Sequence, residues 1–197
     1  MDYAAFFREA FNTIARAVAE LGVDADLDRK PLLIAKTVKR RCMGEMRRLS
    51  ILIRRLIFLM ALSVELGPLK PRPGGNWFRP EPDEGFPHYR ALCLTPESSG
   101  VFPDTLRASS GALPRPGPVE AAPVLVRWRM LLEALKHRDR RAKRLARTLQ
   151  RWKEKGEARP YVRPIPRVHR WPAELGLISG ALQVQMLERL KRWPDTG

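Results

Sequence analysis

Apolar residues recur at intervals of three and four along the first stretch of the chain, the spacing that places side chains on one face of an α-helix. This face is formed by Phe7, Phe11, Ile14, Val18 and Leu21. Asp2 can cap the start of such a helix, and Gly22 is a suitable residue to end it. The pattern predicts an amphipathic helix over residues 2–21 whose apolar face packs in the core.

The same spacing of apolar residues recurs near the end of the sequence, where it predicts a helix over residues 172–193. Its apolar face consists of Leu175, Ile178, Leu182, Met186 and Leu190. Gly176 and Gly180 stand four residues apart, an arrangement that lets another helix approach closely. The apolar run is too short for a membrane helix, so we expect these glycines to serve close packing between helices.

The longest predicted helix covers residues 28–66. Asp28 is a suitable N-cap, Pro31 falls in the first turn, where its missing N–H is tolerated, and no breaker follows before Gly67-Pro68. Apolar residues occupy the a and d positions of a heptad, with Glu45 as the polar exception: Ala35, Val38, Cys42, Leu49, Leu52, Leu56, Leu59 and Leu66. At 1.5 Å per residue such a helix would be roughly 55 Å long.

Three arginine pairs follow one another along this helix at intervals of seven residues. They are Arg40-Arg41, Arg47-Arg48 and Arg54-Arg55. Because seven residues make nearly two turns, the pairs form one stripe away from the apolar seam, which predicts an anion-binding surface roughly 22 Å long. Alternatively, the stripe pairs with Asp24, Asp26 and Asp28, which are close in sequence.

A third helix is predicted from Pro123 to Gly156. Its apolar heptad positions, interrupted by Arg138, are Trp128, Leu131, Leu135, Ala142, Leu145, Leu149 and Trp152. The outward positions are mainly basic: Arg127, Arg129, Lys136, Arg140, Arg141, Lys143, Arg144, Arg147, Arg151, Lys153 and Lys155. Like charges at this spacing destabilise an isolated helix, so packing or a bound anion has to compensate. We expect anion contacts from Arg140, Arg141, Lys143, Arg144, Arg147 and Arg151.

Residues 67–123 interrupt the helical pattern, because they contain most of the prolines and glycines of the chain. Aromatic residues nevertheless occur among the prolines, and disordered segments are usually poor in aromatics. These aromatics are Trp77, Phe78, Phe86, Tyr89 and Phe102. We expect residues 68–95 to lie extended over the helices with their aromatics docked, and residues 96–122 to be loose.

Together these patterns predict an all-α fold, a helical bundle or hairpin of about four helices, two of them long, with a proline-rich irregular excursion. Residues 1–66 form an N-terminal helical pair, and residues 67–123 form the excursion. Residues 124–197 supply the basic long helix and the C-terminal helix. A chain of 197 residues is the size of one domain. We therefore expect 1–66 and 124–197 to pack together.

The net charge of +16 is concentrated in two of these parts. Residues 1–28 carry −4, residues 29–66 carry +8, residues 67–123 are neutral and residues 124–197 carry +12. GC-rich coding, which favours arginine over lysine, is a competing explanation for the net charge, but it would scatter charge along the chain. Concentration on two predicted helices favours an anionic partner.

The segment from Leu56 to Leu66 is apolar on nearly every side of its helix. It is shorter than the roughly 20 apolar residues of a transmembrane helix, and extending it backwards includes Arg54 and Arg55. We expect a buried core helix. An interfacial helix whose arginines reach the lipid headgroups is the alternative.

Residues for common catalytic and metal sites are not arranged in recognisable spacings. His88, His137 and His169 are far apart, and Cys42 and Cys93 form no metal or disulfide motif. Cys42 is expected in the core, although Arg40 and Arg41 would lower its pKa if it were exposed. No phosphate-binding glycine loop or nucleophile elbow occurs. We therefore expect a non-enzymatic protein without metal or cofactor.

Binding of nucleic acid through phosphate contacts is the leading functional hypothesis. Docking on an anionic membrane surface, or on an acidic protein as an adaptor, is the alternative, and the heptad faces also allow a homo-oligomer. The start of the chain, Met1-Asp2-Tyr3, lacks the features of a secretory signal, and two cysteines fit a reducing compartment. We expect a cytoplasmic protein, with membrane contact limited to the surface.

Overall fold

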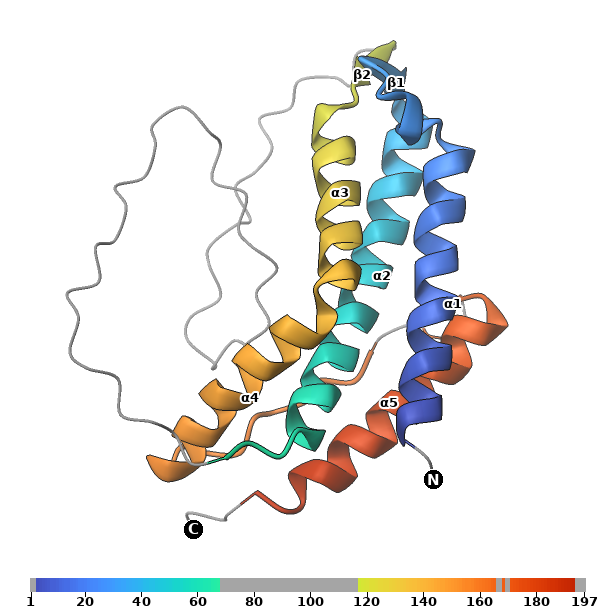
Figure 1. The fold of residues 1–197 in the computed structure, drawn as a ribbon. Helices are drawn as coiled ribbons and strands as arrows, with labels where there is room; N and C mark the ends of the chain where they lie inside the picture. Colours follow the sequence, from blue (N-terminus) through green and yellow to red (C-terminus); the bar gives the residue numbers. More distant parts are fainter. Residues whose placement is uncertain (1–2, 68–116, 166–167, 169–170, 194–197) are drawn as a thin grey trace, which may run out of the picture.

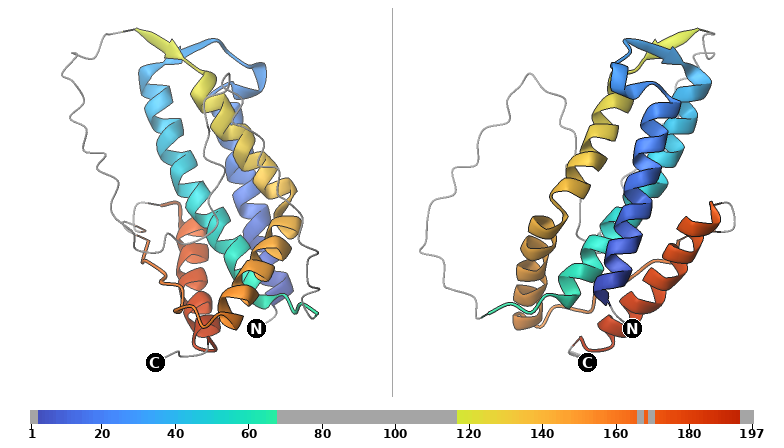
Figure 2. Two further views of the ribbon diagram at one scale, coloured as in Figure 1. Left: turned by 90° about the vertical axis from the view of Figure 1, so that its left-hand side faces the viewer. Right: turned by 45° about the vertical axis from the view of Figure 1, so that its right-hand side comes forward.

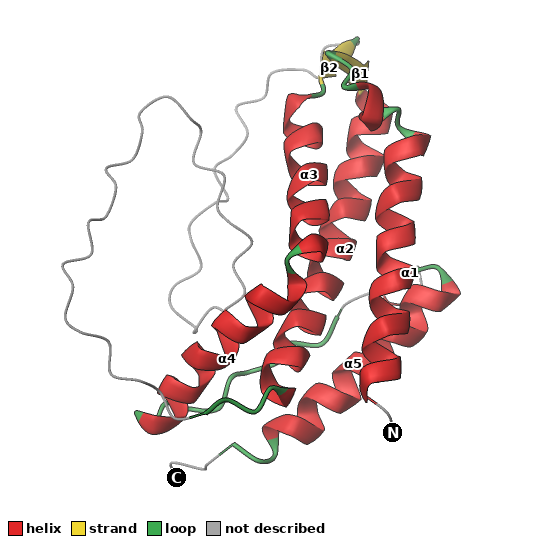
Figure 3. Ribbon diagram, viewed as in Figure 1, coloured by secondary structure: helices red, strands yellow, loops and turns green. Residues whose placement is uncertain are grey.

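Helices dominate the computed structural model, which describes residues 3–67, 117–165, 168 and 171–193 (Figure 1). The described residues form five α-helices, one 3-10 turn and a two-stranded sheet at one end (Figure 3). The all-α prediction is confirmed. The predicted docking of aromatics between 67 and 123 concerns residues outside the described part, apart from Gly67 and residues 117–123.

Helix α1 (Tyr3–Asp24) buries the apolar face that its periodicity predicts, including Phe11, Ile14 and Val18. Its end was predicted incorrectly, because Gly22 does not stop the helix. Gly22 instead lies against the indole of Trp128, where an added Cβ would be 2.5 Å from Cζ2. Trp128 Nε1 donates a hydrogen bond to the Val18 carbonyl at 3.0 Å. Gly22 therefore serves close packing between helices.

Helix α2 (Lys36–Ser63) starts later than the sequence predicts. A short 3-10 turn, η1 (Leu27–Arg29), and strand β1 (Leu33–Ala35) occupy the expected first turns. Lys30 takes a left-handed conformation with φ 53°. The residue before a proline is disfavoured in the right-handed helical region, so Pro31 opposes a helix start at Asp28. At 28 residues, α2 is roughly 42 Å long.

The apolar seam of α2 is buried as its heptad predicts over the central turns. Its fully or nearly fully buried members are Cys42, Leu49, Leu52, Leu56 and Leu59. Met46 is buried next to Glu45, which remains half-exposed. The apolar segment that begins at Leu56 is core, and no described helix has the length and hydropathy of a membrane span.

The predicted third helix is two helices, α3 (Ala122–Lys136) and α4 (Arg138–Glu154). The break is at His137, whose φ of −106° and ψ of 25° depart from helical values. The next residue, Arg138, interrupts the heptad and places its guanidinium 4.8 Å from the centre of the Phe11 ring. The bend lets α4 follow the lower half of α2 (Figure 1).

The antiparallel pairing of β1 with β2 (Pro118–Glu120) places Leu33 opposite Glu120 and Ala35 opposite Pro118. Each strand leads directly into a helix, so α2 and α3 start side by side and run in the same direction (Figure 1). Helix α1 runs antiparallel to both. Helix α5 (Ala173–Leu190) crosses the lower part of α1 and α2 (Figure 2).

One hydrophobic core joins these helices, with α2 in contact with α1, α3, α4 and α5. Its largest fully buried side chains include Phe11, Met46, Leu56, Leu131 and Leu182. Residues from 6–66 and from 119–193 thus contribute to the same core.

Candidate functional site

The arginine stripe of α2 divides into two columns that lean toward different neighbours. Arg41, Arg48 and Arg55 form one column, which we call the paired column. Arg40, Arg47 and Arg54 form the other, which we call the open column. The two residues of each pair are 100° apart around the helix, so adjacent arginines meet different surroundings.

Each arginine of the paired column is bound within the fold. Arg41 Nη2 lies 3.3 Å from Asp24 Oδ2 at the end of α1, and Arg48 Nη1 lies 2.9 Å from Glu45 Oε1. The contact between Arg41 and Asp24 is one of the internal pairings that the sequence offers as an alternative to anion binding.

Arg55 is held more firmly than the other two members of this column. Its Nη1 donates to Gln183 Oε1 of α5 at 2.6 Å, and its Nη2 donates to the carbonyl of Arg163. Burial lowers the pKa of Arg55. Arg55, which the sequence predicts as an anion contact, therefore instead connects α2 to α5 and to the segment that contains Arg163.

The open column has no acidic partner among the residues that the structure describes. Arg40 and Arg47 are exposed, whereas Arg54 is half-buried. The Nε of Arg54 is sealed from solvent and has no hydrogen-bond partner in the described part of the chain. Such a donor is costly unless a partner occupies the site, because its hydration is lost without replacement.

A further arginine approaches this column from α3. Arg127 is half-buried, and its pKa is lowered by burial and then by the positive charges of Arg47 and Arg54. We call Arg47, Arg54 and Arg127 the arginine cluster. Glu133, the one acid of α3, lies instead near His137, with 3.1 Å between Oε2 and Nε2.

The arginine cluster is unfavourable without a counterion. Like charges repel, and the repulsion is stronger where burial reduces screening by water. A phosphate or carboxylate between the guanidinium groups would replace repulsion with charge-assisted hydrogen bonds, and the planar fork of arginine suits two oxygens of one phosphate. The arrangement is therefore suited to binding an anion.

Helix α4 adds a second basic surface. The sequence predicts anion contacts on this helix from Arg140, Arg141, Lys143, Arg144, Arg147 and Arg151. All six are exposed except Arg141, which is half-buried, and no ion pair within the described residues engages them. The opposite face of α4 is buried through Ala142, Leu145, Ala146 and Leu149. The helix keeps its cations outward because its other side packs on α2.

Sequence reasoning missed Arg127 as a site residue, although it counted the residue among the outward basic positions. Periodicity within one helix cannot show that α3 lies beside α2. The pairing of β1 with β2 brings the two helices together, and three-residue strands have too weak a pattern to be predicted.

Cys42 is fully buried in the apolar seam, as predicted. Burial raises the pKa of its thiol, and this effect outweighs the opposing effect of Arg41. A thiol that stays protonated is a poor nucleophile and a poor metal ligand. The structure thus gives Cys42 a packing role, and no group of three or more potential metal ligands occurs among the described residues.

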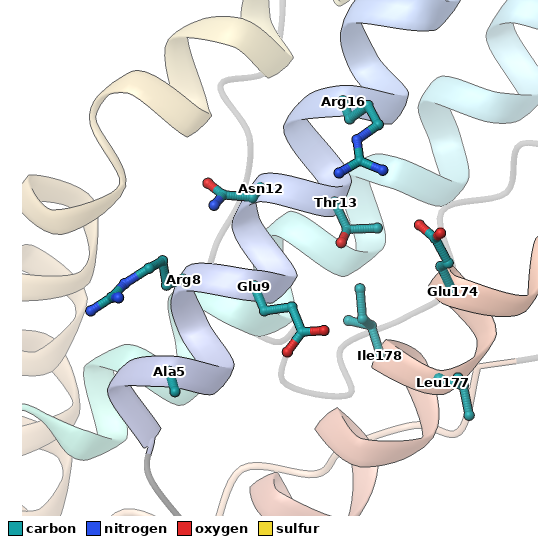
Figure 4. A pocket seen from close by; sticks show the side chains of 9 residues that line it. All are labelled: Ala5, Arg8, Glu9, Asn12, Thr13, Arg16, Glu174, Leu177 and Ile178. Carbon is teal, nitrogen blue, oxygen red and sulfur yellow. The ribbon is translucent and has the colours of Figure 1, made fainter.

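A groove of about 550 Å³ lies between α1 and α5 (Figure 4). Arg8, Arg16, Glu9 and Glu174 line it together with Asn12 and Thr13. Charges of both signs border this groove, so it lacks the uniformly positive surroundings of the arginine cluster.

No protein-family model, curated protein or solved structure matches this chain.

Proposed function

We propose that this protein binds the phosphate backbone of a nucleic acid through the open column of α2 and Arg127, and that it does so without catalysing a reaction. The observation that carries the proposal is the arginine cluster, in which Arg127 of α3 lies close enough to Arg47 and Arg54 of α2 for their charges to lower its pKa. Among the described residues no acid pairs with Arg47 or Arg54, and the buried Nε of Arg54 has no hydrogen-bond partner.

An extended anion fits better than a small one because the basic surface continues beyond the cluster. Arg40 stands seven residues before Arg47, so the open column extends over roughly 21 Å along the axis of α2. Nucleic acids carry closely spaced charges over such a distance. The outward cations of α4 offer additional phosphate contacts.

The contacts we propose give affinity without reading sequence. Arginine binds phosphate oxygens readily, whereas base recognition commonly also uses asparagine and glutamine. Helix α2 contains neither of these two residues, and α4 contains only Gln150. Two cysteines in a chain of this composition fit a reducing compartment, so we propose the cytoplasm as the place where binding occurs.

The test is titration of labelled single-stranded and duplex oligonucleotides with the full chain across a salt series. We expect affinity to fall as salt increases, because phosphate contacts release bound counterions. The double variant Arg47→Gln/Arg54→Gln should reduce the slope of log affinity against log salt by about 2, or about 1 for each lost phosphate contact.

The control is the double variant Arg41→Gln/Arg48→Gln, which removes two charges from the same helix and leaves the open column intact. It should bind nearly as tightly as the wild type. Absence of binding at low salt, or equal losses in both variants, would contradict the proposed site. If anionic vesicles bind while oligonucleotides do not, the lipid alternative replaces nucleic acid; capture only by an acidic protein would favour the adaptor.

A further inference from the structure

Helix α5 has an apolar face that the fold leaves exposed. Leu177, Val184 and Leu187 are 77%, 61% and 45% exposed, respectively. The opposite face already packs in the core through Leu175, Leu182, Met186 and Leu190. Figure 2 shows α5 on the outside of the helical assembly. One side of this helix therefore remains available to a partner.

The two glycines of α5 lie in different surroundings. A Cβ added to Gly176 would lie 3.8 Å from Val168 of the same chain, whereas one added to Gly180 would meet nothing within 4 Å. Gly180 is exposed and lies between Leu177 and Val184 on the apolar face. Without a side chain there, a second helix can approach the backbone closely.

Charge differs between the two ends of α5, at positions beside its exposed apolar face. Exposed Glu174 lies in the first turn, where it borders the groove between α1 and α5, and exposed Lys191 and Arg192 follow the last turn. Lys191 is already paired within the chain, since its Nζ lies 2.6 Å from Glu188 Oε1, so Arg192 is the cation that a second copy would meet. An antiparallel partner helix with the same sequence would place its basic end beside Glu174 and its acidic end beside Arg192. A parallel copy would bring like charges together.

We infer that α5 pairs antiparallel with α5 of a second copy of this chain. The exposed residues are arranged symmetrically about Leu182, since Leu177 and Leu187 are equally distant from it, as are Gly180 and Val184. In this register Leu177 faces Leu187 of the second copy, and Val184 covers Gly180. Such self-complementarity is what a twofold contact requires.

The exposed face is small for a permanent interface. Stable protein interfaces bury about 1,600 Å² in total, more than one pair of helices with three large apolar residues each can cover. We therefore expect a reversible dimer in equilibrium with monomer. Its contact lies on α5, apart from the arginine cluster on α2 and α3.

Sedimentation equilibrium of the full chain tests this inference. The average mass should rise from 22.6 kDa toward twice that value as protein concentration increases. Val184→Asp should weaken self-association on the order of tenfold or more, because two carboxylates would enter an apolar contact. Val23→Asp is the matched control, since Val23 is 70% exposed at the end of α1 and should leave association unchanged.

Two further variants test the geometry. Gly180→Leu adds apolar surface, so nonspecific association would strengthen, whereas the proposed close approach predicts weaker association. Glu174→Arg and Arg192→Glu should each weaken the dimer roughly twofold to fivefold, the range of an exposed ion pair. The two changes combined should restore it.

A constant monomer mass over the whole concentration range would overturn the inference. Equal effects of Val184→Asp and Val23→Asp, or stronger association of Gly180→Leu, would also overturn it. Binding to neutral phospholipid vesicles would overturn it as well, if the chain does not self-associate and Val184→Asp abolishes the binding. The apolar face would then contact lipid.

Discussion

Arginines of the two columns on α2 have opposite electrostatic surroundings. Arg41 lies near the carboxylate of Asp24, whereas Arg47 lies close enough to Arg127 for its charge to lower the pKa of that residue. Both side chains are exposed, so the effects on stability are small. Their signs nevertheless differ, because one charge is attracted to its neighbour and the other is repelled.

Arg41→Gln and Arg47→Gln should therefore change stability in opposite directions. At low ionic strength we expect Arg41→Gln to lower the free energy of unfolding by about 0.2–1 kcal/mol and Arg47→Gln to raise it by a few tenths. Urea denaturation measures both changes. Added salt should reduce both changes, because it screens exposed charges. A loss of stability in Arg47→Gln would argue against repulsion at the cluster.

At the scale of helices, the contact between α1 and α3 depends on a residue without a side chain. Gly22 is buried against Trp128, whose indole is held in place by its hydrogen bond to the Val18 carbonyl. The ring therefore has little freedom to move aside. Gly44 in α2 is the contrasting case, since a Cβ there would meet nothing within 4 Å.

Gly22→Ala should lower the free energy of unfolding by about 1–3 kcal/mol, the usual range for overfilling a packed site. Gly44→Ala should raise it by about 0.5–1 kcal/mol, because alanine favours the helix and the added methyl group meets no obstacle. Thermal or urea denaturation distinguishes the two. Equal effects would mean that α1 and α3 do not approach as closely as the structure has them.

For the molecule as a whole, Arg55 connects parts of the chain that no local interaction holds together. It joins α2 to Gln183 on α5 and to the carbonyl of Arg163 in the segment that leads from α4 toward α5. Burial lowers the pKa of Arg55, so its charge is retained at an energetic cost that these hydrogen bonds offset. The position of α5 depends on this connection and on the apolar core.

Arg55→Lys should destabilise the fold by about 1–3 kcal/mol, because the lysine ammonium lacks the planar fork that donates in both directions. Arg40→Lys is the control on the same helix, since Arg40 is exposed, and it should change stability by less than about 0.5 kcal/mol. Hydrogen exchange of α5 amides should accelerate more in the first variant. Unchanged exchange would show that Arg55 does not hold α5 in place.

The amino-acid sequence by itself determined the helices, the apolar faces that form the core and the placement of cations on α2 and α4. These features depend on a spacing of three and four residues, which is local. Tertiary structure decided the bend at His137 and the continuation of α1 past Gly22, because both involve contacts with a distant part of the chain. The late start of α2 follows instead from the local restriction that Pro31 imposes on Lys30. Tertiary structure also divided the arginine stripe, since only the approach of Asp24, Gln183 and Arg127 distinguishes paired arginines from open ones. Periodicity shows which side of a helix is polar, but the electrostatic state of each arginine depends on its neighbours in space.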